Sequence, residues 1–182
     1  MKTESTVKYI LRLALTLLLI TAVVAVALAA VNSVTAPKIA ELNEQKTQDA
    51  IEAVLPGGGQ EVSFTDSTGL VSTVYKGDAG YAVQVAPAGF GGDISMMVGM
   101  GSDGKVLAIS IISQTETAGL GAVSAATTSA GEAFRGQFAG MSGSVSVTKD
   151  GGAVDAITGA TITSRAVCTG VNAALACVAN FG

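Results

Sequence analysis

The chain of 182 residues contains 14 acidic and 10 basic residues, two cysteines and no histidine. The lack of histidine excludes histidine-ligated zinc or haem and Ser-His-Asp catalysis, and two cysteines are too few to hold an iron–sulfur cluster alone. A net charge of −4 without a basic cluster argues against nucleic acid as a partner.

The first predicted element is a membrane-spanning helix over residues 13–31. Only Thr16 and Thr21 interrupt an apolar run that carries no charge. A helix of this length reaches roughly 28 Å, close to the hydrocarbon thickness of a bilayer. Residues 27–29 resemble a small-residue cleavage site, so a cleaved signal peptide is the alternative. The run is longer than the roughly 7–15 apolar residues of a signal peptide, which favours a retained anchor.

Charge predicts the orientation of this helix. Lys2, Lys8 and Arg12 precede it, against the single acid Glu4. Basic residues next to a span tend to stay in the cytoplasm. Residues 1–12 are therefore expected to be cytoplasmic, and the acidic remainder of the chain is expected on the outer side of the membrane.

A second helix is expected over residues 36–55, within a helical stalk and linker that covers residues 32–59. Pro37 lies near its start, where proline is well tolerated. The run Pro56-Gly57-Gly58-Gly59 ends it. The remaining residues, 60–182, are predicted to form one domain.

This domain is predicted to be mixed, and the fold class of the chain is α+β with one N-terminal transmembrane helix. A hairpin turn is expected at Ser102–Lys105 and a short helix at Ala133–Phe138. Short runs rich in β-branched residues are the strand candidates, at Val71–Tyr75, Tyr81–Val85, Ile94–Met100, Val106–Ser113 and Val145–Thr148.

The last helix is expected over residues 165–178, with Ser164 as its N-cap. Cys168 and Cys177 both lie in it, nine residues apart. At 100° per residue they point to opposite sides of the helix, roughly 13 Å apart along its axis. A disulfide between them is excluded because it requires the α-carbons to approach within about 7 Å.

The loop before this helix, residues 155–164, has the composition of an anion site. It contains an acid, a turn with Gly159 and Ala160, and hydroxyl side chains beside a helix N-terminus. Small residues let backbone N–H groups approach a bulky anion, and the helix dipole favours negative charge there. The sequence is equally compatible with an ordinary loop whose serine and threonines cap the helix.

The same loop resembles the Asp-x-x-(Ser/Thr)-Gly-Ala-Thr attachment signature of the FMN-binding domain family. Asp155, Thr158, Gly159, Ala160 and Thr161 occupy the specified positions. The family includes the G subunits of Rnf-type ferredoxin:NAD oxidoreductases and the C subunits of sodium-pumping NADH:quinone reductases. The resemblance implies that a dedicated transferase takes FMN from FAD and joins its phosphate to the Thr161 hydroxyl.

Other segments strengthen the resemblance. The run Glu116-Thr117-Ala118-Gly119-Leu120-Gly121 resembles a Glu-Thr-Pro-Gly-Leu-Gly loop typical of the Rnf proteins. Segments 81–94 and 134–138 resemble two further parts of the family, in the same order. The resemblance implies a cofactor site built from these residues beside Thr161 and its loop: Glu116, Thr117, Gly119 and Leu120.

The chain departs from the family pattern at Ala118, where proline is usual, and at Gln114, where histidine is common. These positions affect the contacts expected around the flavin ring and leave the attachment sequence intact. Arg165 has two interpretations, as a partner of the phosphate or as an exposed helix residue.

The resemblance implies a membrane-anchored flavoprotein that relays electrons through covalent FMN in an Rnf-type complex that drives ion translocation. The chain would need no catalytic side chain and no metal of its own. Its partners would be the other membrane and peripheral subunits, the flavin transferase and the membrane, with no nucleic acid. Its place would be a bacterial or archaeal cell membrane, with the FMN domain outside. The alternatives are the C subunit of a sodium-pumping reductase and a non-catalytic sensor or structural module.

Overall fold

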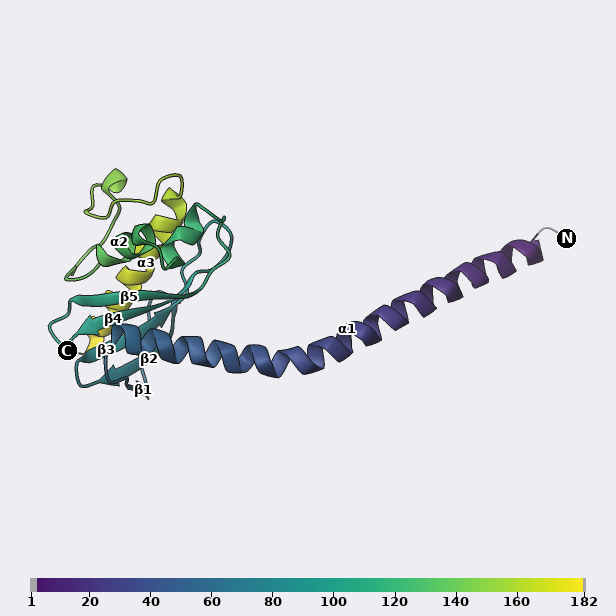
Figure 1. Cartoon of the computed structure of the whole chain (residues 1–182), viewed down its shortest axis with the longest axis horizontal. Coiled ribbons are helices and arrows are strands. Elements are labelled where there is room, and N and C mark those ends of the chain that lie inside the picture. The colour runs from purple at the N-terminus through teal and green to yellow at the C-terminus, as the bar shows by residue number, and fades with distance from the viewer. Residues whose placement is uncertain (1–2, 182) are drawn as a thin grey trace. The chain divides into compact units, whose positions relative to one another are not determined.

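The computed structural model of the chain describes residues 3–181 (Figure 1). It separates into two compact units, one ending at Glu44 and the other beginning at Gln45. The expected α+β class is confirmed, because a long apolar helix precedes an antiparallel sheet with further helices. In chain order, with η for 3₁₀ helices, the elements are α1 (Thr3–Val54), β1 (Gln60–Val62), β2 (Val71–Gly77), β3 (Gly80–Val85), β4 (Ser95–Gly101), β5 (Val106–Ser113), η1 (Gly121–Ala125), α2 (Ser129–Gly136), η2 (Thr148–Asp150), α3 (Thr161–Val178) and η3 (Ala179–Phe181).

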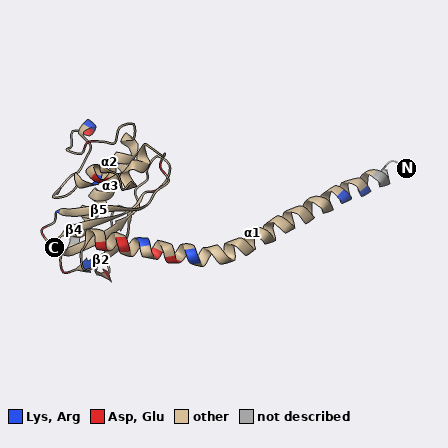
Figure 2. Cartoon of the chain, in the orientation of Figure 1, with Lys and Arg blue, Asp and Glu red and all other residues tan. Residues whose placement is uncertain are grey.

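The first unit has the surface of a membrane-spanning helix. Its large apolar side chains between Val7 and Val34 are each at least 51% exposed. No charged residue lies between Arg12 and Lys38, and Figure 2 shows this stretch of α1 in tan. The threonine hydroxyls within residues 13–31 donate to carbonyls of the same helix. An uncovered apolar helix that satisfies its own polar groups is suited to hydrocarbon.

Within the described residues, α1 from Thr6 onward and α3 are long and apolar enough to cross a bilayer. The two differ in their surroundings. The apolar window of α1 is fully exposed, whereas most of α3 is buried inside the second unit. We therefore assign α3 to the core of the domain and the apolar, exposed part of α1 to the membrane.

The helix α1 runs without interruption through Pro37, where the sequence predicted the start of a separate helix. Proline removes one backbone hydrogen bond from a helix interior. The hydroxyls of Ser33 and Thr35 donate to the carbonyls of Ala30 and Val31 and so add hydrogen bonds to the preceding turns. The effect of the missing hydrogen bond is local, and the helix continues to Val54.

The sheet is an antiparallel meander of five strands in the order β1-β2-β3-β4-β5. The strand predictions for β2 to β5 are confirmed, with shifts of one or two residues at some ends. The predicted turn between β4 and β5 is also confirmed, because Gly104 has φ of 75° and its N–H donates to the Gly101 carbonyl at 3.0 Å.

The alternation of side chains along β4 gives the sheet two buried faces. Met96 and Val98 point to the face on which α3 packs, and Met97 points to the opposite face. On that opposite face the end of α1 contributes Ile51 and Val54 to a smaller core. The methionines of β4 are therefore core residues, as is usual for this flexible side chain.

The segment between β5 and α3 differs from its prediction in two places. The short helix predicted at Ala133–Phe138 is present as α2 but spans Ser129–Gly136, and Phe134 and Phe138 are buried and packed edge to face. The strand predicted at Val145–Thr148 is wrong, since Val147 makes only an isolated bridge with Val154. The side-chain amide of Asn172 binds both the N–H and the carbonyl of Val145 at 2.8 Å, so a side chain takes the place of a partner strand.

Candidate functional site

The helix α3 begins at Thr161, four residues earlier than predicted. Ser164 is therefore a residue of the first turn and not the N-cap. Its Oγ donates to the carbonyl of Ala160 and accepts the N–H of Ile157, each at 3.0 Å. The serine hydroxyl thus folds the preceding loop back onto the helix, and Gly159 makes the turn with φ of 77°.

The first turn of α3 has no side-chain cap. The N-cap residue is Ala160, which has no side-chain oxygen to accept from the first helical N–H groups. Uncapped N–H groups and the positive end of the helix dipole favour an anion at such a place. Thr161 is the first helical residue and half-buried, so its hydroxyl stands at this positive end.

Thr161 opens into a cavity of about 350 Å³. The cavity joins the first turn of α3 to the loop after β5 and to the glycine-rich loop before β4. Its lining residues are Phe90, Glu116, Thr117, Leu120, Gly121, Lys149, Gly159, Ala160, Thr161, Ile162 and Thr163. Segments that are far apart in the sequence therefore meet around the predicted attachment residue.

Glu116 connects these segments and is only 8% exposed. Its Oε1 accepts the N–H of Gly91 at 2.8 Å, and its Oε2 accepts the hydroxyl of Thr163. Gly121 lies against this pair, and a side chain at that position would collide with Thr163 and Glu116. The carboxylate is thus an internal link between two loops and α3, with hydrogen bonds to both of its oxygens.

The rim of the cavity is apolar and open. Phe90 is 69% exposed, Leu120 is 42% exposed and Ile162 is 51% exposed. Among the described residues of the domain, these three and Leu107 are the exposed large apolar side chains. Phe90, Leu120 and Ile162 all lie at this one cavity and form a surface suited to a planar or apolar ligand.

Two cations lie near Thr161, and they have different partners. The Nζ of Lys149 donates to the Oγ1 of Thr161 at 3.3 Å. Arg165 is exposed and forms two contacts of 2.7 Å with the Asp150 carboxylate. The guanidinium of Arg165, through these hydrogen bonds, lowers the pKa of Asp150. Of the two interpretations of Arg165, the structure agrees with the exposed helix residue.

Some of the predicted site residues lie outside the cavity lining. Gly119 and Thr158 are exposed and do not line it. Asp155 is exposed as well, and its backbone N–H and carbonyl both bind the side-chain amide of Gln137. The cavity lining therefore contains Glu116, Thr117, Leu120, Gly159, Ala160 and Thr161 from the predicted set. The sequence analysis assigned no role at the site to Lys149, Thr163 or the rim residue Ile162.

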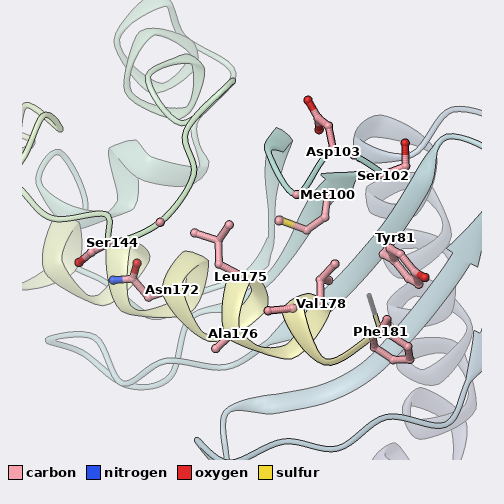
Figure 3. Close-up of a pocket in the computed structure, with 14 residues that line it drawn as sticks. Tyr81, Met100, Ser102, Asp103, Ser144, Asn172, Leu175, Ala176, Val178 and Phe181 are labelled. Atoms are coloured by element: carbon pink, nitrogen blue, oxygen red, sulfur yellow. The ribbon is translucent and has the colours of Figure 1, made fainter.

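A larger cavity of about 920 Å³ lies at the other end of α3 (Figure 3). Figure 3 shows Tyr81 beside Phe181 at one end of it, and Ser144 and Asn172 at the other. The rings of Tyr81 and Phe181 stack at 5.1 Å, and the amide of Asn172 is occupied by backbone. Among the described residues, this larger cavity has no buried side-chain polar atom without a hydrogen-bond partner, and no predicted site residue lines it. The cavity at Thr161 is therefore the candidate site.

The cysteines contribute to the core and not to a site. Cys168 and Cys177 are both buried and free. Burial raises the pKa of Cys168 to about 11. Within residues 3–181 no cluster of histidine, cysteine or carboxylate side chains is arranged to hold a metal ion.

Comparison with known proteins matches both units of the chain. Residues 89–176 match the FMN-binding domain family, and residues 1–54 match the RnfG N-terminal region. The matched range 89–176 contains every residue that lines the candidate cavity.

Relatives from three organisms match over most of their length. The G subunit of the Na⁺-translocating ferredoxin:NAD⁺ oxidoreductase complex of Acetobacterium woodii is 36% identical over 91% of this chain and 89% of the relative. The G subunit of the proton-translocating ferredoxin:NAD⁺ oxidoreductase complex of Clostridium ljungdahlii is 34% identical over 85% and 83%. The G subunit of the ion-translocating oxidoreductase complex of Methanosarcina acetivorans is 33% identical over 92% and 94%.

Proposed function

The chain belongs to the RnfG family, the G subunits of Rnf-type ion-translocating oxidoreductase complexes, and we propose that it relays electrons through FMN in such a complex. The observation that carries this proposal is the position of Thr161. Its hydroxyl stands at the uncapped start of α3 and opens into a cavity with an apolar rim.

The residues around Thr161 fit the two chemically different parts of FMN. The uncapped N–H groups of the first turn and the Lys149 ammonium suit a phosphate. The exposed side chains of Phe90, Leu120 and Ile162 suit the flat face of a flavin ring. When bound, FMN supplies the redox chemistry, because it accepts and gives up one or two electrons. The protein holds and orients it and excludes water from one side.

We propose that FMN is attached covalently, through an ester between its phosphate and the Oγ1 of Thr161. Glu116 would hold the cavity in shape, and Thr117 and Leu120 would border the cofactor. Three predicted residues lie outside the cavity lining and would act through the conformation of their loops. These are Gly119 in the loop after β5, and Asp155 and Thr158 in the loop before α3. The Gln137 amide, which binds the backbone of Asp155, supports this indirect role.

The proposed topology follows from α1 and from charge. Residues 1–12 would be cytoplasmic, 13–31 would span the membrane, 32–59 would form stalk and linker, and 60–182 would carry FMN on the outer side. The basic residues before the span support this orientation. The partners would be the other subunits of the complex and, during maturation, a flavin transferase. The relatives are named as G subunits, which favours this assignment over the C subunit of a sodium-pumping reductase.

The covalent link is tested with the full chain in detergent, co-expressed with a flavin transferase. A denaturing gel under ultraviolet light should show a fluorescent band, and the intact mass should increase by FMN less one water. Thr161→Ala should abolish both signals, and Thr161→Ser should retain them because serine keeps the hydroxyl. Thr169→Ala is the matched control, since Thr169 is an exposed threonine further along α3. Wild-type chain without bound flavin, or flavin retained by Thr161→Ala, would contradict the proposal.

A further inference from the structure

We propose that Lys149 is the positioning residue for the FMN phosphate, and that the Asp150–Arg165 ion pair holds it beside Thr161. This inference rests on the proposed function, because it assumes that a phosphate is joined to Thr161. It adds a residue that neither the sequence motif nor the family comparison indicates.

The contact that carries the inference joins Lys149 to the atom that would be esterified. The Nζ of Lys149 lies 3.3 Å from the Oγ1 of Thr161 and donates to it. Lys149 is also the basic residue among those that line the cavity. A phosphorus atom bonded to Oγ1 brings its charged oxygens next to the same ammonium group. The ammonium, which now donates to a neutral hydroxyl, would then also face an oxygen of opposite charge.

Arg165, the other cation near Thr161, is already paired with Asp150. Its guanidinium binds both oxygens of Asp150 at 2.7 Å, in the paired geometry typical of arginine and carboxylate. Asp150 is the sequence neighbour of Lys149 in η2, so this ion pair fastens the lysine-bearing turn to α3. Arg165 therefore acts by placing Lys149 and not by meeting the phosphate itself.

A second attachment holds the same turn from its other side. The N–H of Thr148 donates to the carbonyl of Val154 at 2.8 Å, and the N–H of Val154 donates to Ser146 at 3.1 Å. The turn ends at Gly151, whose φ of 83° is accessible to glycine at little cost. Lys149 is thus an exposed side chain on a turn that is tied down at both ends.

The role of Lys149 follows from the negative charges of the reactant and the product of the attachment reaction. The Oγ1 of Thr161 forms a bond to the FMN phosphorus of FAD, the diphosphate P–O bond breaks, and AMP leaves with the electron pair. The hydroxyl proton passes to the transferase or to water. The incoming diphosphate and the phosphodiester product are both anionic, and a fixed ammonium beside Oγ1 attracts the first and stabilises the second.

The test measures the rate at which purified full-length chain gains flavin from FAD and transferase, by gel fluorescence and intact mass. Lys149→Met should slow attachment roughly threefold to tenfold, the range expected for a partly exposed charge contact. Lys149→Arg should restore the rate to within about twofold, because it keeps the charge. Lys105→Met is the matched control, since Lys105 is an exposed lysine in the β4–β5 turn, and it should react at the wild-type rate.

Salt dependence separates a charge effect from a structural one. Because exposed charges are screened by salt, the ratio of the wild-type rate to the Lys149→Met rate should fall toward one as salt is added. A ratio that is independent of salt, or a Lys149→Met rate equal to wild type, would overturn the inference. A Lys149→Met chain that gains no flavin at all supports it if Lys149→Arg is active and overturns it if Lys149→Arg is also inactive. A wild-type chain that gains no flavin would instead contradict the proposed function.

Discussion

Replacing Glu116 with alanine removes the carboxylate that links the loops of the cavity to α3. Both of its oxygens accept hydrogen bonds, from the Gly91 N–H and the Thr163 hydroxyl. Gly91 is exposed, so water can replace the lost acceptor there. Thr163 is 1% exposed, and its hydroxyl would lose its acceptor inside the domain. An unsatisfied buried group costs about 1–3 kcal/mol, so we expect the free energy of unfolding to fall by roughly 2–3 kcal/mol.

The assay is urea unfolding of the full chain in detergent without FMN, followed by tyrosine fluorescence. Tyr75 and Tyr81 lie in the sheet and report on the domain. Glu116→Gln should lose less than Glu116→Ala, about 1 kcal/mol, because the amide oxygen still accepts one hydrogen bond. Glu132→Gln is the control, since Glu132 is an exposed glutamate on α2. It should stay within about 0.5 kcal/mol of wild type.

A double-mutant cycle with Thr163→Val isolates the link itself. If the carboxylate and the hydroxyl act as a pair, the losses for Glu116→Gln and Thr163→Val will not add, and the coupling should be about 1 kcal/mol. Additive losses, or a Glu116→Ala chain as stable as wild type, would refute the idea that this carboxylate holds the cavity together.

Two further predictions concern the core. Gly99→Ala should lower the free energy of unfolding by about 1–3 kcal/mol, because the new methyl group would meet the Val54 carbonyl and lie 2.8 Å from the Val54 Cβ. Gly136→Ala is the control, since its methyl group would meet no atom within 4 Å, and the free energy of unfolding measured in urea should stay the same or rise slightly. Burial raises the pKa of Cys168 from 9.0 to about 11, so the folded chain keeps this proton when the unfolded chain has lost it. Stability should therefore be unaffected below pH 9 and fall as the pH rises from about 9 to about 11, and the slope should be shallower in Cys168→Ala.

The strands of the sheet could be predicted because their pattern is local. Runs such as Val106–Ser113 combine β-branched residues with a glycine-containing turn just before them. The edge strand β1 was missed because it has only three residues, Gln60–Val62, and little apolar character. The valines of Val145–Thr148 also alternate like a strand, but the backbone of Val145 is bound by the side chain of Asn172, which lies 27 residues later in α3. No local pattern predicts that competition.

The start of α3 was misplaced for a related reason. Ser164 follows a polar, glycine-containing loop and is of a type that often caps helices, so the helix was expected to begin after it. In the fold, Thr163 is buried and bonded to Glu116, which lies 47 residues earlier, and this tertiary contact extends the helix. The attachment motif could be recognised because it is contiguous. Lys149 could not, because its relation to Thr161 exists only after η2 is fastened to α3.

The placement of Thr161 on a helix and not on a loop bears on how a relay would work. Groups held on rigid elements keep their geometry better than groups on loops. Thr161 is the first residue of an 18-residue helix, and Ser164, Val167 and Val171 of that helix are fully buried. The backbone of Thr161, the proposed attachment residue, is therefore held by the core of the domain, and the cavity beside it has an exposed rim. A cofactor joined there would be tethered to the most buried helix of the domain and still be open to an electron partner. A small domain without any metal-binding cluster in its described residues could therefore serve as an electron carrier. Its own contribution would be to hold the cofactor at one fixed position.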